Sequence, residues 1–243
     1  MIAANIDTLF IVTSCNDDFK VEWLDLFLAL AHEAEVHPVI VLTKTDTVDK
    51  PDDWISRAKA LSPSLDVIGL DTTDVLQLTQ LEEWCQHGKT VAMVGSSGVG
   101  KSTLLNQLAG ISQATAELSR KVVQGRHTTT TRSLHRVNAG GWIIDTPGIR
   151  GLRLYDGMRG IERLFKDVTE LTNQCRFRDC SHEGDPGCAI QAAISIGTID
   201  VERFKRWQKL LQNGMEIQKS SREATSSLRD RNQKNKPARK KRR

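Results

Sequence analysis

Short apolar runs alternate with amphipathic stretches along the first part of the chain. The runs TLFIVTS at 8–14 and PVIVLTK at 38–44 are rich in β-branched residues and predict two strands. Between them, apolar side chains recur at helical spacing behind acidic residues, which predicts a helix. These apolar positions are Phe19, Trp23, Leu26, Phe27 and Leu30. The pattern therefore predicts a β-α-β unit.

The same alternation continues as far as residue 95. We expect helices near 52–61 and 74–86, and strands at 65–70 and 90–95. Strands that alternate with helices are typical of the α/β class, so we predict a doubly wound, mostly parallel sheet.

The second half of the chain changes character. A helix begins near Lys101, and the polar, threonine-rich segment 111–131 has no periodicity and is interpreted as a long loop. RSLHRVNAGGWIIDTPG then predicts two strands joined by an Asn-Ala-Gly-Gly turn. We expect further helices near 158–172 and 198–218, and disorder in isolation from about residue 220.

Composition places few limits on this picture. The 243 residues are 39% hydrophobic and 26% charged, enough for one α/β core and a small appendage. No stretch approaches the roughly 18 to 20 apolar residues of a membrane span, and the start lacks the features of a signal peptide. The five cysteines, three of them crowded together, suit a reducing compartment and a metal site. We therefore expect a cytoplasmic protein without a membrane partner.

Charge is unevenly distributed. The formal net charge is +4, but 219–243 holds 11 Lys or Arg against 2 acids, which leaves 23 basic and 28 acidic residues elsewhere. The tail is interpreted either as a segment that binds RNA through salt-sensitive phosphate contacts or as a solubilising segment.

The segment GSSGVGKS at 95–102 matches the phosphate loop G-x-x-x-x-G-K-[ST], and it lies between a predicted strand and a predicted helix. Its glycines let the backbone curl so that N–H groups point at phosphates. Lys101 would bridge the β- and γ-phosphates and Ser102 would ligate magnesium. The candidate residues are Gly95, Ser96, Ser97, Gly98, Val99, Gly100, Lys101, Ser102 and Thr103.

Two later segments suit the same site. Asp145 ends a hydrophobic strand in IIDTPG and could hold magnesium through a water, while Gly148 could offer its N–H to the γ-phosphate. The loop GRHTTTTRS at 125–133 offers a threonine to complete the magnesium shell, with Thr129 the first choice. An extended polar loop is the alternative.

The segment VLTKTD at 41–46 suggests which base is bound. Asp46 could accept hydrogen bonds from N1 and the exocyclic amine of guanine, and the stem of Lys44 could lie over the purine. Thr43 stands where such a motif usually has asparagine, and GLDTTD at 69–74 does not match the usual Ser-Ala of the second base loop. If TKTD is accidental, the chain is a P-loop ATPase or kinase.

The base motif precedes the phosphate loop, which is the reverse of the usual order. Ligand loops at the carboxyl ends of neighbouring strands remain adjacent after circular permutation, so the order does not exclude a common site. The chain resembles the RsgA family of circularly permuted GTPases over about residues 3–218. The resemblance rests on this motif order, on the cysteine cluster and on the segments GSSGVGKSTLLN, GRHTTTT and DTPGIRGL.

The resemblance implies slow hydrolysis of GTP to GDP, stimulated by the small ribosomal subunit and its rRNA during late maturation. It also implies that His127, in the threonine-rich loop, orients the attacking water, because Ile149 cannot. Family members typically carry an amino-terminal OB-fold, whereas this chain begins almost at the first predicted strand, so we expect either a short form or a truncated start. A GTP-gated RNA-binding adaptor with little turnover is the main alternative. We expect a monomer.

The segment CRFRDCSHEGDPGC has the ligand spacing C-x4-C-x-H-x5-C. Three thiolates and one imidazole form a closed tetrahedral set, which is typical of one structural zinc ion. A reduced cluster without metal is the alternative. The predicted ligands are Cys175, Cys180, His182 and Cys188. We therefore predict a permuted GTPase domain at 1–157, a helical zinc-binding domain at 158–219 and a basic disordered tail at 220–243.

Overall fold

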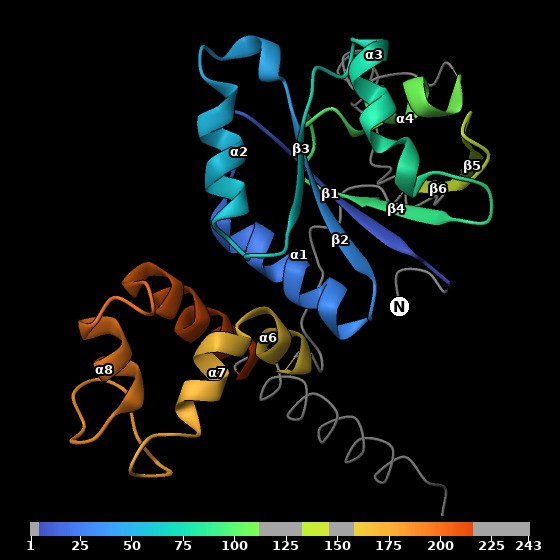
Figure 1. Cartoon of the computed structure of the whole chain (residues 1–243). Coiled ribbons are helices and arrows are strands. Elements are labelled where there is room, and N and C mark those ends of the chain that lie inside the picture. Colours follow the sequence, from blue (N-terminus) through green and yellow to red (C-terminus); the bar gives the residue numbers. More distant parts are fainter. Residues whose placement is uncertain (1–4, 112–132, 146–157, 216–243) are drawn as a thin grey trace, which may run out of the picture. The chain divides into compact units, whose positions relative to one another are not determined.

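The computed structural model describes residues 5–111, 133–145 and 158–215 (Figure 1). The chain forms two compact units, Met1–Leu152 and Arg153–Arg243, and each is described separately below.

The first unit is built on a six-stranded sheet with strand order β3-β2-β1-β4-β6-β5. All adjacent pairs are parallel except β5 with β6, which are antiparallel. The strands are β1 (Thr8–Ser14), β2 (His37–Thr43), β3 (Asp66–Gly69), β4 (Thr90–Val94), β5 (Ser133–Arg136) and β6 (Trp142–Asp145). The mostly parallel α/β sheet predicted from the sequence is confirmed.

Helices cover both faces of this sheet. Figure 1 shows α1 and α2 on one side and α3 and α4 on the other, the doubly wound arrangement expected from the alternation of elements. The helices are α1 (Val21–Glu33), η1 (Thr45–Thr47), α2 (Pro51–Lys59), α3 (Val75–Leu78), η2 (Thr79–Trp84) and α4 (Lys101–Ala109). The single helix expected near 74–86 is thus a short α-helix continued by a 3-10 helix.

The core explains why the strands appear in the sequence as continuous apolar runs. Every residue of β1 is buried. Phe10 and Val12 belong to one cluster with Leu104 of α4. Because side chains alternate along a strand, Leu9 and Ile11 face the side on which α1 lies. A strand covered on both faces needs apolar residues at both alternations.

The turn between β5 and β6 requires glycine because it lies against another loop. The N–H of Gly141 donates to the carbonyl oxygen of Cys85 over 2.9 Å. A methyl group at Gly141 would lie 2.5 Å from that oxygen. The hairpin turn is therefore held against the segment that enters β4.

The second unit is helical in its described part. It contains α6 (Met158–Leu164), α7 (Lys166–Thr172), α8 (Ala189–Ser195) and a helix over 201–215. Along the described ranges, no helix has the length and apolar character needed to cross a membrane.

The helix expected over 158–172 is interrupted at Phe165. There the carbonyl oxygen of Leu164 accepts a hydrogen bond from Nη2 of Arg203 over 2.9 Å. The same guanidinium donates two hydrogen bonds to Asp167, from Nε to Oδ2 over 2.6 Å and from Nη2 to Oδ1 over 2.8 Å. A side chain from the 201–215 helix therefore joins α6 to α7 where the backbone changes direction.

Candidate functional site

The phosphate loop runs from the end of β4 to the start of α4, as its sequence predicts. Gly98 and Gly100 have φ values of 86° and 95°, in the left-handed region that favours glycine. Gly95 faces β1 so closely that a methyl group there would lie 2.1 Å from the carbonyl oxygen of Val12. Only glycine lets the loop begin this close to the neighbouring strand.

Lys101 points back across this loop. Its Nζ donates to the carbonyl oxygens of Gly95, over 2.9 Å, and Ser96, over 2.6 Å. Burial lowers the pKa of Lys101, and the nearby carboxylates of Asp145 and Asp18 oppose that shift. The ammonium group is thus tied to the first two residues of the phosphate loop.

Thr43 connects the base motif to the phosphate loop. It is fully buried at the end of β2, and its Oγ1 lies 2.6 Å from the carbonyl oxygen of Val99 and 3.1 Å from that of Thr13. A hydroxyl has one proton, so the shorter contact with Val99 marks the stronger bond. The hydroxyl therefore braces the phosphate loop from the strand that carries the base motif.

Lys44 and Asp46 follow in a tight turn. Lys44 adopts φ 58°, unusual for a residue with a side chain, and its carbonyl oxygen accepts from the hydroxyl of Thr47 over 2.8 Å. Asp46 is exposed, which leaves its carboxylate open to a ligand. Burial, and then the charge of Asp46, raise the pKa of Cys15, which follows β1, so this carboxylate acts near the carboxyl end of that strand.

The loop after β3 reaches the same place although it lacks the Ser-Ala signature. Gly69, at the end of β3, lies against Thr45: a methyl group on this glycine would be 3.4 Å from Cγ2 of the threonine. Thr72 is buried, and a methyl group at Gly100 would lie 3.6 Å from its Cγ2 and also from Oγ1 of Thr43. Loops from β2, β3 and β4 therefore meet around the start of α4.

Asp145 ends β6, the neighbour of β4 on its other side. It is partly buried, and its charge acts on Lys101 as described above. Three other predicted residues, His127, Thr129 and Gly148, lie outside the described residues.

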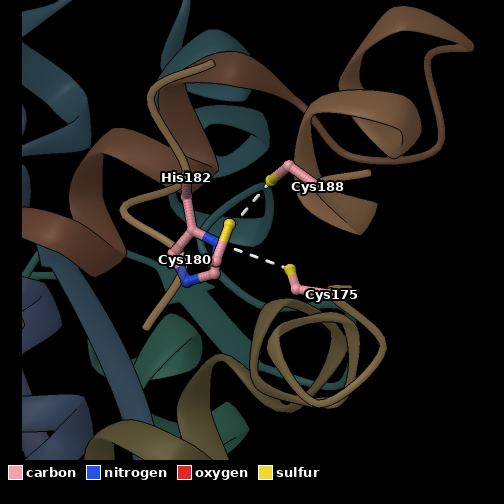
Figure 2. Close-up of side chains that lie close together, drawn as sticks. All are labelled: Cys175, Cys180, His182 and Cys188. Atoms are coloured by element: carbon pink, nitrogen blue, oxygen red, sulfur yellow. Dashed lines mark hydrogen bonds between the residues drawn. The ribbon is translucent and has the colours of Figure 1, made fainter. Parts of the chain in front are cut away.

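The four predicted metal ligands converge in the second unit (Figure 2). Their ligand atoms all lie within 4.8 Å of one another. Nδ1 of His182 is 3.6 Å from Sγ of both Cys175 and Cys188, so Nδ1 is the nitrogen that faces the thiols. Zn–S bonds of about 2.3 Å in a tetrahedron place sulfurs about 3.8 Å apart, so these residues fit a zinc ion with little movement.

A second layer of contacts orients these ligands. His182 itself has φ 63°, and its carbonyl oxygen accepts from Nε2 of Gln191 over 2.6 Å. Its ring meets Trp207 edge to face with centroids 5.9 Å apart. Burial alone would raise the pKa of Cys175, but hydrogen bonds from the N–H of Ala189, the thiol of Cys180, the N–H of Ile190 and the thiol of Cys188 bring it below its ordinary value. The thiolate form that a metal requires is thereby favoured.

The order of the elements agrees with comparison to known proteins. A family model described as RsgA GTPase matches residues 1–155. The chain belongs to the RsgA GTPase family. It is 50% identical over 214 residues to the small ribosomal subunit biogenesis GTPase RsgA of Mesorhizobium japonicum, covering 86% of this chain and 62% of the relative. It is 48% identical over 213 residues to RsgA 2 of Vibrio parahaemolyticus, covering 87% and 60%.

Two solved structures share the fold. YjeQ from Thermotoga maritima matches with a TM-score of 0.63 at 26% identity, over 87% of this chain and 72% of that protein. YloQ, described as a circularly permuted GTPase, matches with a TM-score of 0.62 at 26% identity, over 87% and 69%. The permuted order read from the sequence, with β1 to β3 ahead of the phosphate loop, is thereby confirmed. The chain spans about three-fifths of the length of the curated RsgA relatives named above.

Two residues near the phosphate loop, Asp18 and Thr72, were not predicted as site residues from the sequence. Asp18 follows β1, and its charge reaches Lys101; its position just beyond the end of a parallel strand was the available signal. Thr72 lies in GLDTTD, which does not match the Ser-Ala signature, and no sequence signal marks its contact with the phosphate loop.

Proposed function

We propose that the chain binds guanine nucleotides at the loops around the start of α4 and hydrolyses GTP to GDP and phosphate. The observation that carries this proposal is the bond between Thr43 and Val99, because it links the base motif and the phosphate loop in one rigid site. Membership of a family described as GTPases supports the same reading.

Guanine would be read by Asp46, whose exposed carboxylate can accept from N1–H and the 2-amino group. Lys44 would cover one purine face with its aliphatic stem. The 6-oxo group of guanine requires a donor, and Thr72 offers its backbone N–H: in the described part of the chain no hydrogen bond occupies it. Adenine presents an acceptor at N1 and a donor amine at position 6, the reverse of guanine, and has no polar group at position 2.

The phosphates would lie in the loop Gly95–Ser102, with Lys101 exchanging its bonds to backbone carbonyls for bonds to phosphate oxygens. Ser102 and Thr129 would hold Mg²⁺, and Asp145 would act through a water. When bound, the metal would neutralise charge on the phosphates.

The attacking water would be oriented by His127. Ile149 follows the DTPG segment at the position where a glutamine often serves, and it has no hydrogen-bonding group. A neutral imidazole can accept a proton from water, so the histidine would supply the missing function once a partner fixes its loop.

We infer that the small ribosomal subunit, with its rRNA, is that partner, since relatives at up to 50% identity are named small ribosomal subunit biogenesis GTPases. Binding would stimulate hydrolysis, and the step would fall late in subunit maturation. We further propose a monomer that acts in the cytoplasm, because free cysteines suit a reducing compartment.

We propose one structural zinc ion at Cys175, Cys180, His182 and Cys188. Four protein ligands close a tetrahedral site and leave no open position, so its role would be to hold the helices of the second unit together.

The deciding experiment measures GDP formation from GTP by the purified chain, alone and with isolated small subunits. We expect a stimulation of at least about ten-fold, lost in His127→Ala. If the chain binds GTP but small subunits do not stimulate its hydrolysis, the chain is a nucleotide-gated adaptor and not a hydrolase. Equal competition by ATP and GTP would remove guanine selectivity from the proposal.

Base reading is tested separately with Asp46→Asn. This change replaces one acceptor oxygen by a donor amide, which suits the 2-oxo group of xanthine better than the 2-amino group of guanine. We expect affinity to fall for GDP and rise for XDP. An unchanged preference for GDP would remove Asp46 from the site.

A further inference from the structure

The loop that joins β3 to α3 is closed by a single side chain from α3. Oε1 of Gln77 accepts from the N–H of Asp71 over 2.9 Å, while its Nε2 donates to Oδ2 of Asp74 over 2.9 Å. One amide thus holds the first and last residues of the segment Asp71–Asp74. We refer to these three residues, Asp71, Asp74 and Gln77, as the amide bridge.

The residues inside the amide bridge are fixed as well. Oδ1 of Asp71 accepts from both the N–H and the hydroxyl of Thr73, each over 2.8 Å. Oδ1 of Asp74 accepts from the N–H of Leu76 over 2.9 Å and so caps α3. At the other end, the N–H of Leu70 donates to the carbonyl oxygen of Leu42 over 2.9 Å. The short segment between these anchors has little freedom left.

That segment contains Thr72, the residue of this loop that approaches the start of α4. The buried position of Thr72 and its contact distance to Gly100 follow from how the loop is folded. The N–H of Asp71 is directed at Gln77, which leaves the next N–H along the chain, that of Thr72, as the donor available to a base. In this loop, which lacks the Ser-Ala signature, these hydrogen bonds restrict the backbone around Thr72.

We propose that Gln77 is a positioning residue for base specificity, which sets the Thr72 N–H so that it donates to the 6-oxo group of a bound guanine. The inference rests on the proposed binding of guanine nucleotides and deepens it. Gln77 touches no ligand itself; it acts through the backbone between Asp71 and Asp74.

The contribution of Gln77 can be separated from that of Asp46 by choosing the nucleotide. GDP and 6-thio-GDP share the N1–H and 2-amino groups that Asp46 would bind, and they differ only in the acceptor at position 6. Sulfur accepts hydrogen bonds weakly, so the ratio of the two dissociation constants reports the donor of the loop. One hydrogen bond corresponds to a ratio of about three to ten.

The experiment measures binding of GDP, 6-thio-GDP and IDP to the chain and its variants by competition with a fluorescent nucleotide. In Gln77→Ala we expect GDP to bind about three- to ten-fold more weakly, 6-thio-GDP to be nearly unchanged, and the GDP to IDP ratio to stay at its original value. Gln80→Ala, an exposed glutamine on the following turn, is the matched control and should leave all three constants unchanged.

Exchanging the donor and the acceptor between residues 77 and 74 should restore the lost specificity, which a purely structural role of Gln77 does not predict. Gln77→Glu keeps the acceptor for Asp71 but loses the donor to Asp74, so it should behave like Gln77→Ala. Adding Asp74→Asn restores a donor, now from residue 74, and asparagine still caps a helix. The double variant should recover most of the ratio of 6-thio-GDP to GDP.

Three outcomes would overturn the proposal. In the first, Gln77→Ala weakens the binding of all three nucleotides equally, which would indicate a general structural role. In the second, Gln77→Ala changes none of the three dissociation constants, and in the third, the wild-type chain binds 6-thio-GDP as tightly as GDP. A wild-type chain without preference for GDP over ADP would instead refute the guanine site itself, and so the two failures are distinguishable.

Discussion

The hydroxyl of Thr43 lies 2.6 Å from the carbonyl oxygen of Val99, 56 residues further along the chain. One residue ends the strand of the base motif, and the other belongs to the phosphate loop. An asparagine amide at position 43 would reach further, but here the close approach of β2 to the loop lets a shorter side chain span the gap. Thr43, which stands where the motif usually has asparagine, thus still contacts the phosphate loop.

Replacing Thr43 by valine tests this contact. Valine keeps the branched shape and removes the hydroxyl, which leaves the buried carbonyl of Val99 without that donor. We expect a loss of about 1 to 3 kcal/mol in the free energy of unfolding and weaker binding of GDP, measured by chemical denaturation and nucleotide titration. Thr43→Ser retains the donor and should keep most of the affinity. Equal behaviour of the valine and serine variants would contradict the assignment.

The hairpin turn provides a test of packing. In Gly141→Ala the new methyl group would lie 2.5 Å from the carbonyl oxygen of Cys85. The backbone must shift, so we expect the free energy of unfolding to fall by about 1 to 3 kcal/mol.

The control for the hairpin is Gly88→Ala. Gly88 has φ 82°, but a methyl group there meets no atom within 4 Å. Its free energy of unfolding should fall only by the cost of alanine in a left-handed backbone, about 1 kcal/mol. A smaller loss at Gly141 than at Gly88 would show that the turn is not tightly held.

Patterns that depend on local periodicity predicted most of the fold. The strands could be predicted because a sheet covered on both faces requires apolar runs. The phosphate loop could be predicted because its conformation requires glycines at fixed positions. The break at Phe165 could not, since it depends on a guanidinium about forty residues away. The short helix α8 was missed for a related reason, because seven residues carry too little periodicity to distinguish it from a loop.

The same division holds within the site. Lys101 and the cysteine cluster carry spacing signals, because their chemistry requires fixed separations along the chain. Thr72 and Gln77 carry none, because what matters is where a backbone N–H points after folding. The approach of Thr72 to Gly100 joins distant parts of the chain, and the bonds of Gln77 to Asp71 and Asp74 follow no fixed spacing rule.

The metal cluster predicts a defined stoichiometry. We expect one zinc ion per chain by elemental analysis, and its loss in Cys188→Ser, because three remaining ligands no longer close the tetrahedron. The helical signal should fall on chelation, since binding and folding of such a site are coupled. Cys15→Ser, in the other unit and also buried, should retain the metal. Full zinc content in Cys188→Ser would refute the ligand set.

The bidentate pair of Arg203 and Asp167 makes stability depend on pH. Burial alone would raise the pKa of Asp167, but the hydrogen bonds and charge of Arg203 bring it below its ordinary value. A carboxylate with a lowered pKa stabilises the fold above the unfolded-state pKa of about 3.9, and the benefit disappears as pH falls through the lower, folded-state value. The carboxylate is 41% exposed, so solvent limits the effect to about 1 kcal/mol.

We therefore expect Asp167→Asn to be less stable than the wild type at pH 7, with the difference shrinking as the pH is lowered from about 4 towards 2. Denaturant titrations of both proteins at each pH measure it, and acid effects on the cysteine cluster cancel because both proteins share it. Glu170→Gln, which alters an exposed pair with Lys166 at 3.6 Å, should show almost no difference at any pH. A gap for Asp167→Asn that stays constant from pH 7 to 2 would mean that its cost comes from lost shape, because a contribution from charge must disappear once the carboxylate of the wild type is protonated.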